Sequence, residues 1–393
     1  ILMDMHTCPV CSGNRLTSFL RRSHVPTFQN LVMADQAEAK SIMRGELDLM
    51  ACEECGFVFN RAFALAPIDY DEAYDNTQSY SSFFDDYLND LVAKLVEEKG
   101  VKDCLIVEVG CGKGQFLHKL VSYPGANNRG IGFDPTYVGP DEDLDGRLQF
   151  QRRYYDSSCT DIKPDIVVCR HVIEHIPEPL TILKAVRDAL DTSPDARVFF
   201  ETPCVEWILS NRVVWDFFYE HCSIFTQNSL ALAFERSGFV VDQVRHIFGG
   251  QYLWLEARPT ASATPAKREK TEETAKLAAA YGVHEAEQRR IWLERLHGLK
   301  DGGKVALWGA GAKGATFANL VDPERELIDC VIDLNPNKQG RFIPGTGHPI
   351  VAPASVEARG VASAVLMNPN YREENLRRLA DSNIKLALID WSE

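Results

Sequence analysis

The sequence lacks several features that mark whole classes of protein. No apolar run approaches the ~20 residues that a membrane-spanning helix requires, and the first residues lack the charged-then-apolar pattern of a secretory signal. Positive charge is also scarce, because 42 Lys and Arg face 56 Asp and Glu, for a net charge of −14. We therefore expect a cytoplasmic protein without membrane contact and without a nucleic-acid partner, since nucleic acids bind to basic grooves.

The chain is long enough, and rich enough in hydrophobic residues, to form several folded domains. The 393 residues suggest two or three domains, and 45% hydrophobic with 25% charged residues is an ordinary globular composition. The 11 cysteines are odd in number and scattered, which argues against a disulfide framework. We predict four segments. They are a small zinc-binding domain at 1–68, an α/β domain at 69–260, a linker with a helix at 261–303 and a second α/β domain at 304–393.

The third segment begins with a stretch rich in Pro, Ala and Thr and continues as a helical pattern from Glu273 to Leu299. Gly302 and Gly303 end the helix. We expect an interdomain strut. The alternative is a coiled-coil seam in a homo-oligomer, although the apolar positions do not keep a strict heptad.

Four of the cysteines form two close pairs near the N-terminus. Cys8 and Cys11 enclose Pro-Val, and Cys52 and Cys55 enclose Glu-Glu. Each CxxC turn can bring two thiolates to about 2.3 Å from one Zn²⁺, and two such turns complete a tetrahedron. We predict a closed structural zinc site. The alternatives are four unrelated thiols and a redox-active CxxC, which is less favoured because such motifs lie near a βαβ pattern.

A glycine-rich turn follows the apolar run at 104–109, which predicts a buried parallel strand. A helix is expected to begin near Gln115. In a doubly wound sheet, ligands bind where strand ends meet helix starts, and glycines allow the backbone to approach them closely. The expected cofactor contacts in this turn are Glu108, Gly110, Gly112 and Gly114.

Two cofactor classes compete for this turn. The pattern E-x-G-x-G-x-G resembles motif I of methyltransferases that use S-adenosylmethionine (SAM), whereas the dinucleotide pattern would require a glycine at Gln115. Asp134 ends the next predicted strand, where its carboxylate can accept hydrogen bonds from two ribose hydroxyls. The strand at 165–170 and His171 after it continue the resemblance. We expect a class I, Rossmann-like SAM methyltransferase domain with Asp134 and His171 beside the cofactor.

The segment from His171 to His175 reads H-x-x-E-H, the pattern of inverted zinc peptidases. That chemistry requires a helix that places both histidines on one face. Here the pattern directly follows a predicted strand, and Pro177 and Pro179 interrupt the region. The peptidase interpretation is therefore not favoured.

A second histidine lies in the run Phe218-Tyr219-Glu220-His221. A histidine among aromatic residues often has only a structural role. An adjacent Glu–His pair in such surroundings favours catalysis, because burial and a neighbouring carboxylate tune the imidazole.

The order of these motifs resembles the bacterial sugar C-methyltransferase family. The resemblance covers nearly the whole chain and rests on the CxxC pairs, VEVGCGKG, the His175-Ile-Pro sequence, the Glu220-His221 pair, and GAGAKG followed by DLNPNKQGRFIPGT. It implies a zinc-binding domain, a SAM domain and a C-terminal Rossmann-like domain. The family methylates a carbon next to the keto group of a nucleotide-linked deoxysugar, which implies a role in natural-product biosynthesis.

The resemblance also implies roles for individual residues. His221 matches the family's base, which removes the proton alpha to the carbonyl, with Glu220 beside it. His175 matches a histidine that faces the keto-sugar and can hold the enolate oxygen. Methylation of oxygen or nitrogen by the same base is an alternative.

Two departures from the family bear on the acceptor. The family often has a tyrosine two residues before the glutamate, where this chain has Phe218, and Tyr219 is displaced by one position. Tyr74 and Tyr80 both fall in the tyrosine-rich stretch where the family has its active-site tyrosine. We expect these tyrosines to contact the substrate, with Tyr219 among the catalytic residues.

The last segment opens with a predicted strand, Lys304–Trp308, and a full GxGxxG pattern at Gly309–Gly314. Three interpretations compete: a site for substrate phosphate at the helix N-terminus, a bound dinucleotide such as NAD, and a structural relic. The family resemblance favours the nucleotide-sugar. The expected substrate contacts are Gly311, Lys313 and Asn368, with Asp333, Lys338 and Arg341 as further candidates.

Overall fold

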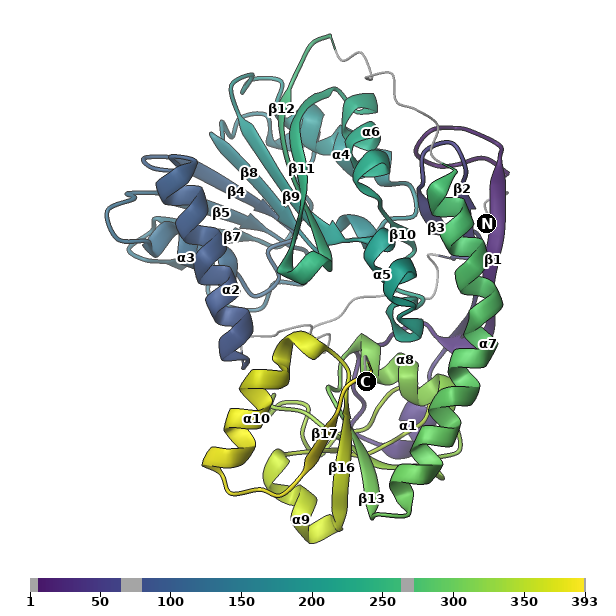
Figure 1. The fold of residues 1–393 in the computed structure, drawn as a ribbon. Coiled ribbons are helices and arrows are strands. Elements are labelled where there is room, and N and C mark those ends of the chain that lie inside the picture. The colour runs from purple at the N-terminus through teal and green to yellow at the C-terminus, as the bar shows by residue number, and fades with distance from the viewer. Residues whose placement is uncertain (1–5, 65–79, 263–271, 392–393) are drawn as a thin grey trace.

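The computed structural model describes residues 6–64, 80–262 and 272–391. Three β-sheets organise the chain, and Figure 1 shows two of them one above the other with the third along one side. The predicted mixed α/β architecture is confirmed.

The largest sheet has eight strands in the order β11-β12-β9-β8-β4-β5-β7-β6. The strands from β9 to β7 are parallel, and β12 and β6 run antiparallel to them. Strand β11 pairs antiparallel with β12 and therefore runs in the same direction as β9. This is the class I methyltransferase sheet that the glycine-rich turn predicted. The strands are β4 (Leu105–Val109), β5 (Arg129–Phe133), β6 (Glu142–Asp143), β7 (Leu148–Gln151), β8 (Ile166–Arg170), β9 (Arg197–Pro203), β11 (Phe239–Ile247) and β12 (Tyr252–Pro259).

Helices cover both faces of this sheet (Figure 1). Because side chains alternate along a strand, Ile106 and Val168 pack with α2 (Ser82–Ala93) and α3 (Gln115–Ser122). The intervening Val107 and Val109 pack with α4 (Pro179–Ala189) and α6 (Gln227–Arg236) on the other face. Burial on both faces explains why the central strands β4 and β8 are mostly apolar in sequence.

The C-terminal sheet is fully parallel, in the order β15-β14-β13-β16-β17. It contains the predicted strand β13 (Lys304–Trp308) with the predicted bounds. Helices α9 (Val356–Arg359) and α10 (Arg372–Asp381) cover one face, and α8 (Ala312–Val321) covers the other. The remaining strands are β14 (Ile328–Ile332), β15 (Ile350–Val351), β16 (Val361–Leu366) and β17 (Ala387–Ile389).

The N-terminal sheet has the order β1-β2-β3-β10. Strands β1 (Leu16–Pro26), β2 (Arg44–Cys52) and β3 (Val58–Asn60) come from the N-terminal segment, together with helix α1 (Gln36–Lys40). The fourth strand, β10 (Ser223–Ile224), follows directly after His221. The N-terminal sheet is therefore completed by a strand from the segment 69–260, although no strand was predicted at this position.

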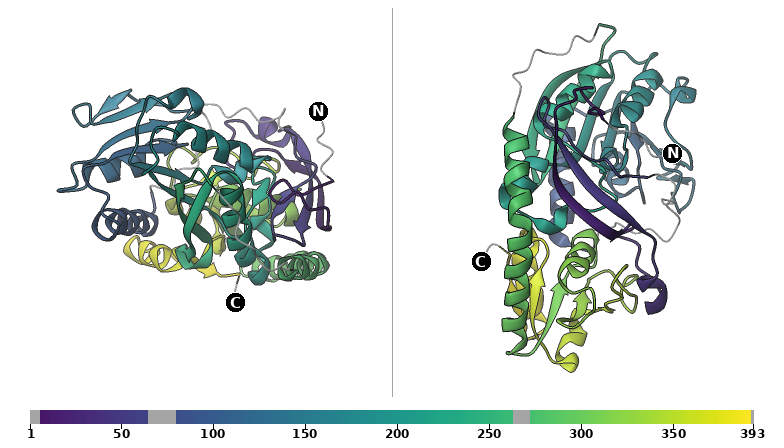
Figure 2. Two further views of the ribbon diagram at one scale, coloured as in Figure 1. Left: turned by 90° about the horizontal axis from the view of Figure 1, so that it is seen from above. Right: turned by 90° about the vertical axis from the view of Figure 1, so that its right-hand side faces the viewer.

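Helix α7 (Glu273–Lys300) runs along β1 and β2 and continues beside β13 and α8, as the two views of Figure 2 show. Its buried side chains include Tyr281, Trp292 and Leu296. Gly282 lets the helix approach β1 closely, because an added Cβ would lie 2.1 Å from the Phe19 carbonyl oxygen. The helix thus contacts both the N-terminal and the C-terminal sheet.

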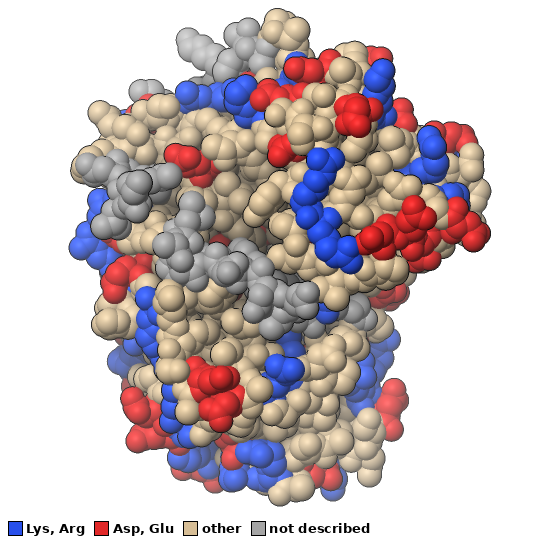
Figure 3. All heavy atoms as spheres, turned by 180° about the vertical axis from the view of Figure 1, so that it is seen from behind, with Lys and Arg blue, Asp and Glu red and all other residues tan. Residues whose placement is uncertain are grey.

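Across the described residues, no helix combines the length and apolarity needed to cross a membrane. On the face in Figure 3, Lys and Arg side chains are interspersed with Asp and Glu.

Candidate functional site

Two topological switch points face one cavity. In the large sheet the chain reverses its direction of winding between β4 and β8, and in the C-terminal sheet between β13 and β16. Ligands of doubly wound sheets bind at such points, at the carboxyl ends of the strands. A cavity of about 1420 Å³ is lined from the first switch point by the 110–114 turn and from the second by the 309–314 turn.

The 110–114 turn has the backbone geometry that its glycines predict. Gly110, Gly112 and Gly114 have φ angles of +68°, +53° and +77°, which favour glycine. A Cβ added at Gly110 would lie 2.3 Å from a side-chain carbon of Val172, so the Val172 side chain packs directly against this turn. A Cβ on Gly112 would meet nothing within 4 Å. The turn therefore presents open backbone toward the cavity.

The two predicted acidic cofactor contacts both line the cavity. Asp134 supports the turn, because its carboxylate accepts a hydrogen bond from the Gly112 N–H at 2.9 Å. Glu108 is buried and accepts from the Leu117 N–H at 3.2 Å. Burial raises the pKa of Glu108 to about 8, so it is largely protonated at neutral pH in the free protein.

His171 lies between two buried carboxylates. Its Nδ1 is 3.1 Å from Glu174, and its Nε2 is 2.6 Å from Glu201, which also binds Arg170 at 3.1 Å. Burial lowers the pKa of His171, but the two carboxylates outweigh burial and raise it to about 9. His171 is therefore an imidazolium at neutral pH, held rigidly in the wall of the cavity.

His175 and His221 form a pair inside the same cavity. Their ring centroids are 4.9 Å apart and their planes are nearly perpendicular, at 87°. An oxygen of Glu174 and a nitrogen of each ring all lie within 4.8 Å of one another. Burial lowers the pKa of His175 and holds the pKa of His221 well below its usual range. Both imidazoles are therefore neutral at pH 7.

Two of the predicted catalytic residues do not line this cavity. The Tyr219 hydroxyl accepts from the Ala64 N–H at 3.0 Å, and its ring stacks on Phe63. The Glu220 carboxylate accepts from the Gln29 N–H at 2.6 Å, toward the N-terminal sheet. The chain turns at residues 219–220, so the side chains of Glu220 and His221 have different surroundings.

The other residues of this region contribute in different ways. Phe218 does line the cavity and packs on the His221 ring at 4.2 Å. Tyr80 lines its edge with 41% of its surface exposed. Tyr74 lies outside the described residues.

The 309–314 turn has several of its polar groups already bonded. The Ala310 N–H donates to Asp333 at 2.8 Å, and the Ala312 N–H donates to Asn30 of the N-terminal segment at 2.9 Å. Asp333 therefore holds the turn, as Asp134 does in the first domain. These bonds occupy N–H groups that a dinucleotide pyrophosphate would otherwise use.

The predicted substrate contacts beyond this turn also bridge domains. The Lys313 ammonium pairs with Asp216 at 2.9 Å, and Asn368 exchanges hydrogen bonds with Gln251. Lys338 is buried beneath the turn and donates to the Ala310 carbonyl at 3.3 Å. These residues, together with Gly311, line the cavity. Arg341 is exposed and does not line it.

Two family models match the chain: a methyltransferase domain over residues 80–244 and a C-methyltransferase C-terminal domain over residues 258–385. The chain is a SAM-dependent methyltransferase. The C-methyltransferase NovU of Streptomyces niveus is 25% identical over 404 residues, which cover 95% of this chain and 92% of that protein.

Other similar proteins match this methyltransferase over shorter regions. The ubiquinone biosynthesis O-methyltransferase of Aeromonas salmonicida is 33% identical over 103 residues, 25% of this chain and 42% of that protein. The crystal structure of the Burkholderia thailandensis 1,6-didemethyltoxoflavin-N1-methyltransferase with bound 1,6-didemethyltoxoflavin and S-adenosylhomocysteine has a TM-score of 0.36. It is 16% identical and covers 52% of this chain and 96% of its own.

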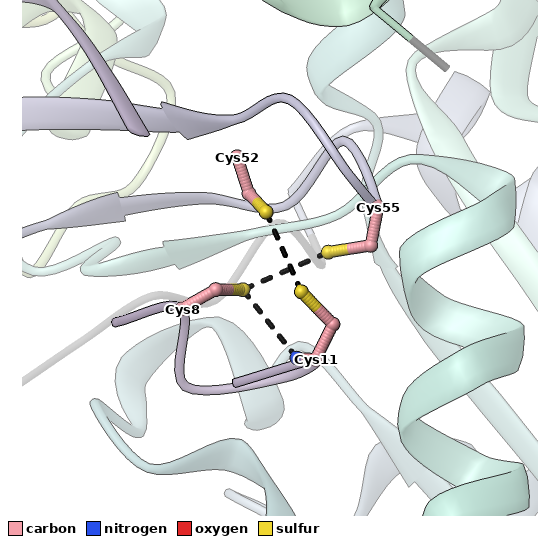
Figure 4. Close-up of side chains that lie close together, drawn as sticks. All are labelled: Cys8, Cys11, Cys52 and Cys55. Carbon is pink, nitrogen blue, oxygen red and sulfur yellow. Dashed lines mark hydrogen bonds between the residues drawn. The ribbon is translucent and has the colours of Figure 1, made fainter. Parts of the chain in front are cut away.

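The four paired cysteines of the methyltransferase converge as the sequence predicts (Figure 4). The Sγ atoms of Cys8 and Cys55 are 3.6 Å apart, and those of Cys11 and Cys52 are 3.5 Å apart. Four sulfurs at about 2.3 Å from a tetrahedral zinc ion would be about 3.8 Å from one another. The donor set therefore fits one closed tetrahedral ion.

Sequence reasoning missed several residues that shape the methyltransferase site. Glu174 is the glutamate of the H-x-x-E-H pattern at residues 171–175, and this pattern was the sequence signal for its role in the site. Asn30 and Gln29 gave none, because their partners are distant in the sequence. The peptidase geometry is absent, since residues 173–175 form a single 3₁₀ turn rather than a helix.

Proposed function

We propose that the protein methylates the carbon next to the keto group of a nucleotide-linked keto-deoxysugar, or of a similar phosphate-bearing acceptor. The observation that carries the proposal is the position of the His175–His221 pair. The two neutral imidazoles face the cavity that joins the 110–114 turn to the 309–314 turn. An acceptor with a reacting carbon at one end and a phosphate at the other fits such a cavity.

The cofactor end of the cavity is assigned to SAM, which supplies an electrophilic methyl group on a sulfonium. The 110–114 turn approaches the cofactor with its backbone, and Asp134 and Glu108 contribute carboxylates toward its hydroxyl and ammonium groups. His171 shapes the wall between cofactor and acceptor. Its charge and that of Arg170 are balanced by Glu174 and Glu201, so the wall is rigid without repelling a cationic cofactor.

His221 is assigned as the base that removes the proton alpha to the carbonyl. Its low pKa leaves a free lone pair at neutral pH. His175 is assigned to the enolate oxygen. One nitrogen of its ring hydrogen-bonds to the backbone of Glu220, so the second nitrogen can donate to the enolate oxygen only after the neutral ring has taken up a proton from solvent. The Glu174 carboxylate, within 4.8 Å, stabilises the resulting charge as the enolate forms.

The roles of Glu220 and Tyr219 in this proposal are indirect. Glu220 ties the segment before His221 to the N-terminal sheet through the Gln29 N–H. Tyr219 fixes the same segment against Ala64. Both position the base without touching the acceptor.

The phosphate end is assigned to the 309–314 turn. Lys338 supplies a buried ammonium group there, and no carboxylate pairs with it among the described residues. Gly311 lies beside it at the N-terminus of α8, where backbone N–H groups other than those of Ala310 and Ala312 favour an anion. Lys313 and Asn368 orient this end through their bonds to the methyltransferase domain.

The proposal is tested by incubating the protein with a nucleotide-linked keto-deoxysugar in D₂O. Without SAM, the proton alpha to the keto group should exchange for deuterium, as followed by NMR. With SAM, a new carbon-bound methyl signal should appear. Methyl transfer to oxygen or nitrogen without prior exchange would contradict the enolate chemistry and support the alternative acceptor class.

The affinity for SAM is expected to rise with pH because of Glu108. A cationic ligand favours the ionised carboxylate, whose pKa of about 8 in the free protein means that binding at pH 7 must release a proton. Affinity should rise by up to about tenfold per pH unit below that value. Calorimetry between about pH 6 and 7.5 measures this slope. Glu108→Gln should flatten it, and equal slopes in both proteins would refute the assignment.

We further propose that the Cys8, Cys11, Cys52 and Cys55 cluster holds one structural zinc ion. Its four thiols are largely buried, and the CxxC backbones aim N–H groups at the sulfurs, as Gly13 does toward Cys11 Sγ at 3.3 Å. A site with four thiolates has no open position for substrate.

Elemental analysis should find about one zinc per chain, as expected for a closed four-thiolate site. Cys52→Ser should lower zinc content severalfold and lower the melting temperature, because metal binding and local folding are coupled. Cys104→Ser is the matched control, since Cys104 is a free thiol outside the cluster. A wild-type protein that is folded, active and free of zinc would contradict the site.

A further inference from the structure

A second cavity, of about 570 Å³, lies between the N-terminal sheet, α7 and α8. We name it the basic pocket. Its lining includes six basic side chains, Arg21, Arg22, His24, Lys40, Arg44 and Arg289, and one carboxylate, Glu324. The chain as a whole has a net charge of −14. The basic side chains of the pocket therefore form a local excess of positive charge on an acidic protein.

Some of these charges are neutralised by residues outside the pocket. Arg22 pairs with Glu285 at 2.9 Å, and Arg21 pairs with Asp48 at 3.3 Å. The others are not compensated in this way. Within the described part of the chain, Arg44 and Arg289 donate only to carbonyl oxygens, and Lys40 has no carboxylate partner. The rim of the pocket therefore carries three cations against Glu324.

The floor of the pocket supplies an independent observation. Thr316, on α8, is only 8% exposed, and its hydroxyl has no hydrogen-bond partner. The same residue lines the pocket. Buried hydroxyls are nearly always bonded, and a ligand or water in the pocket is one partner that would complete the Thr316 hydroxyl.

We propose that the basic pocket binds a small phosphate-bearing anion. Arginine and lysine side chains at the rim and a hydroxyl at the floor are the donors that phosphate oxygens accept. The volume is within the usual range for small-molecule sites. The site is separate from the phosphate end of the catalytic cavity, where Lys338 lies.

The basic pocket shares a wall with the catalytic cavity. Phe218 lines both cavities, and its ring packs on His221 at 4.2 Å. Gln29 also lines the basic pocket and bonds Glu220 through its backbone N–H. An anion in the pocket therefore lies behind the segment that carries His221.

Inorganic pyrophosphate is a suitable probe, titrated by calorimetry into the full-length protein at about 0.15 M salt. Arg289→Gln and Thr316→Val should each weaken its binding by about tenfold. Thr316→Val removes only the unbonded hydroxyl, so the unliganded melting temperature should not fall. Arg290→Gln is the matched control, because Arg290 is the next residue of α7 and pairs with Glu287 and Glu294 instead.

Lys338→Met distinguishes the two phosphate sites. If pyrophosphate binding is unchanged in Lys338→Met but weaker in Arg289→Gln and Thr316→Val, the anion binds in the basic pocket. Binding lost with Lys338→Met and unchanged in the other two would assign the anion to the 309–314 turn and overturn the proposal. Absence of measurable binding at millimolar pyrophosphate would overturn it as well.

Discussion

Replacing His221 by glutamine is expected to lower the turnover number by about 10²- to 10⁴-fold, the usual contribution of a general base. Glutamine keeps a polar side chain of similar reach but cannot take up a proton. The exchange of the proton alpha to the keto group should be lost with the methylation. Affinity for SAM should be unchanged, because the cofactor turn is formed by other residues. Release of S-adenosylhomocysteine and NMR-detected exchange measure the two steps.

The pH dependence provides an independent check on this base. Burial and the neighbouring His175 hold the pKa of His221 well below its usual range. A base works only when unprotonated, so kcat/KM for the acceptor, measured at saturating SAM, should fall on the acid side with an apparent pKa below 6.5 and be level through neutrality. His118→Gln is the control, because His118 is exposed. Full alpha-proton exchange in the His221→Gln protein would contradict its role.

Replacing Arg22 by methionine is expected to lower the free energy of unfolding by about 3–5 kcal/mol, the cost of breaking one buried ion pair. The Arg22 guanidinium bonds Glu285 of α7 and also donates at 2.6 Å to the carbonyls of Val214 and Phe217. Its removal leaves a buried carboxylate and two carbonyls without their partner. Denaturant unfolding measures the loss.

The neighbouring Arg21 provides a matched control for this variant. Its side chain is 69% exposed and pairs with Asp48 at the surface, so Arg21→Met should cost no more than about 1 kcal/mol. The double variant Arg22→Met with Glu285→Leu should recover part of the stability, because no charge is then left buried. If Arg22→Met unfolds like Arg21→Met, the ion pair does not join these elements.

The elements that the sequence predicted well are those whose signal is local. The run Lys304–Trp308 and the run before Gly110 are parallel strands, and each is mostly apolar and directly followed by a glycine. The same reasoning located the helix Glu273–Leu299, whose observed end at Lys300 differs by one residue. The spacing of the two CxxC pairs also predicts a local geometry, because each CxxC turn fixes the positions of two sulfur atoms relative to each other.

The contacts that the sequence could not predict join distant parts of the chain. Glu220 is adjacent to His221 in sequence, yet its carboxylate turns to the Gln29 N–H, 191 residues away. Lys313 was expected at a phosphate, but Asp216 lies close enough to neutralise it. Glu174 was visible in its motif, but its importance depends on Thr202 and His171 meeting it in space. Such pairings depend on how the domains dock.

The pairing of β10 with β3 has a consequence for the order in which the chain is completed during synthesis. Cys55 closes the cysteine cluster early, whereas β3 gains its second neighbour only when Ser223 and Ile224 pair with Phe59 and Val58. At ribosomal rates of about 5–20 residues per second, the outer edge of β3 stays unpaired for on the order of 10 s until β10 has been synthesised. Until then β3 is an open edge able to pair with other chains. The pairing that closes it also anchors the segment directly after His221, so the base is fixed in place in the same step that protects the nascent chain.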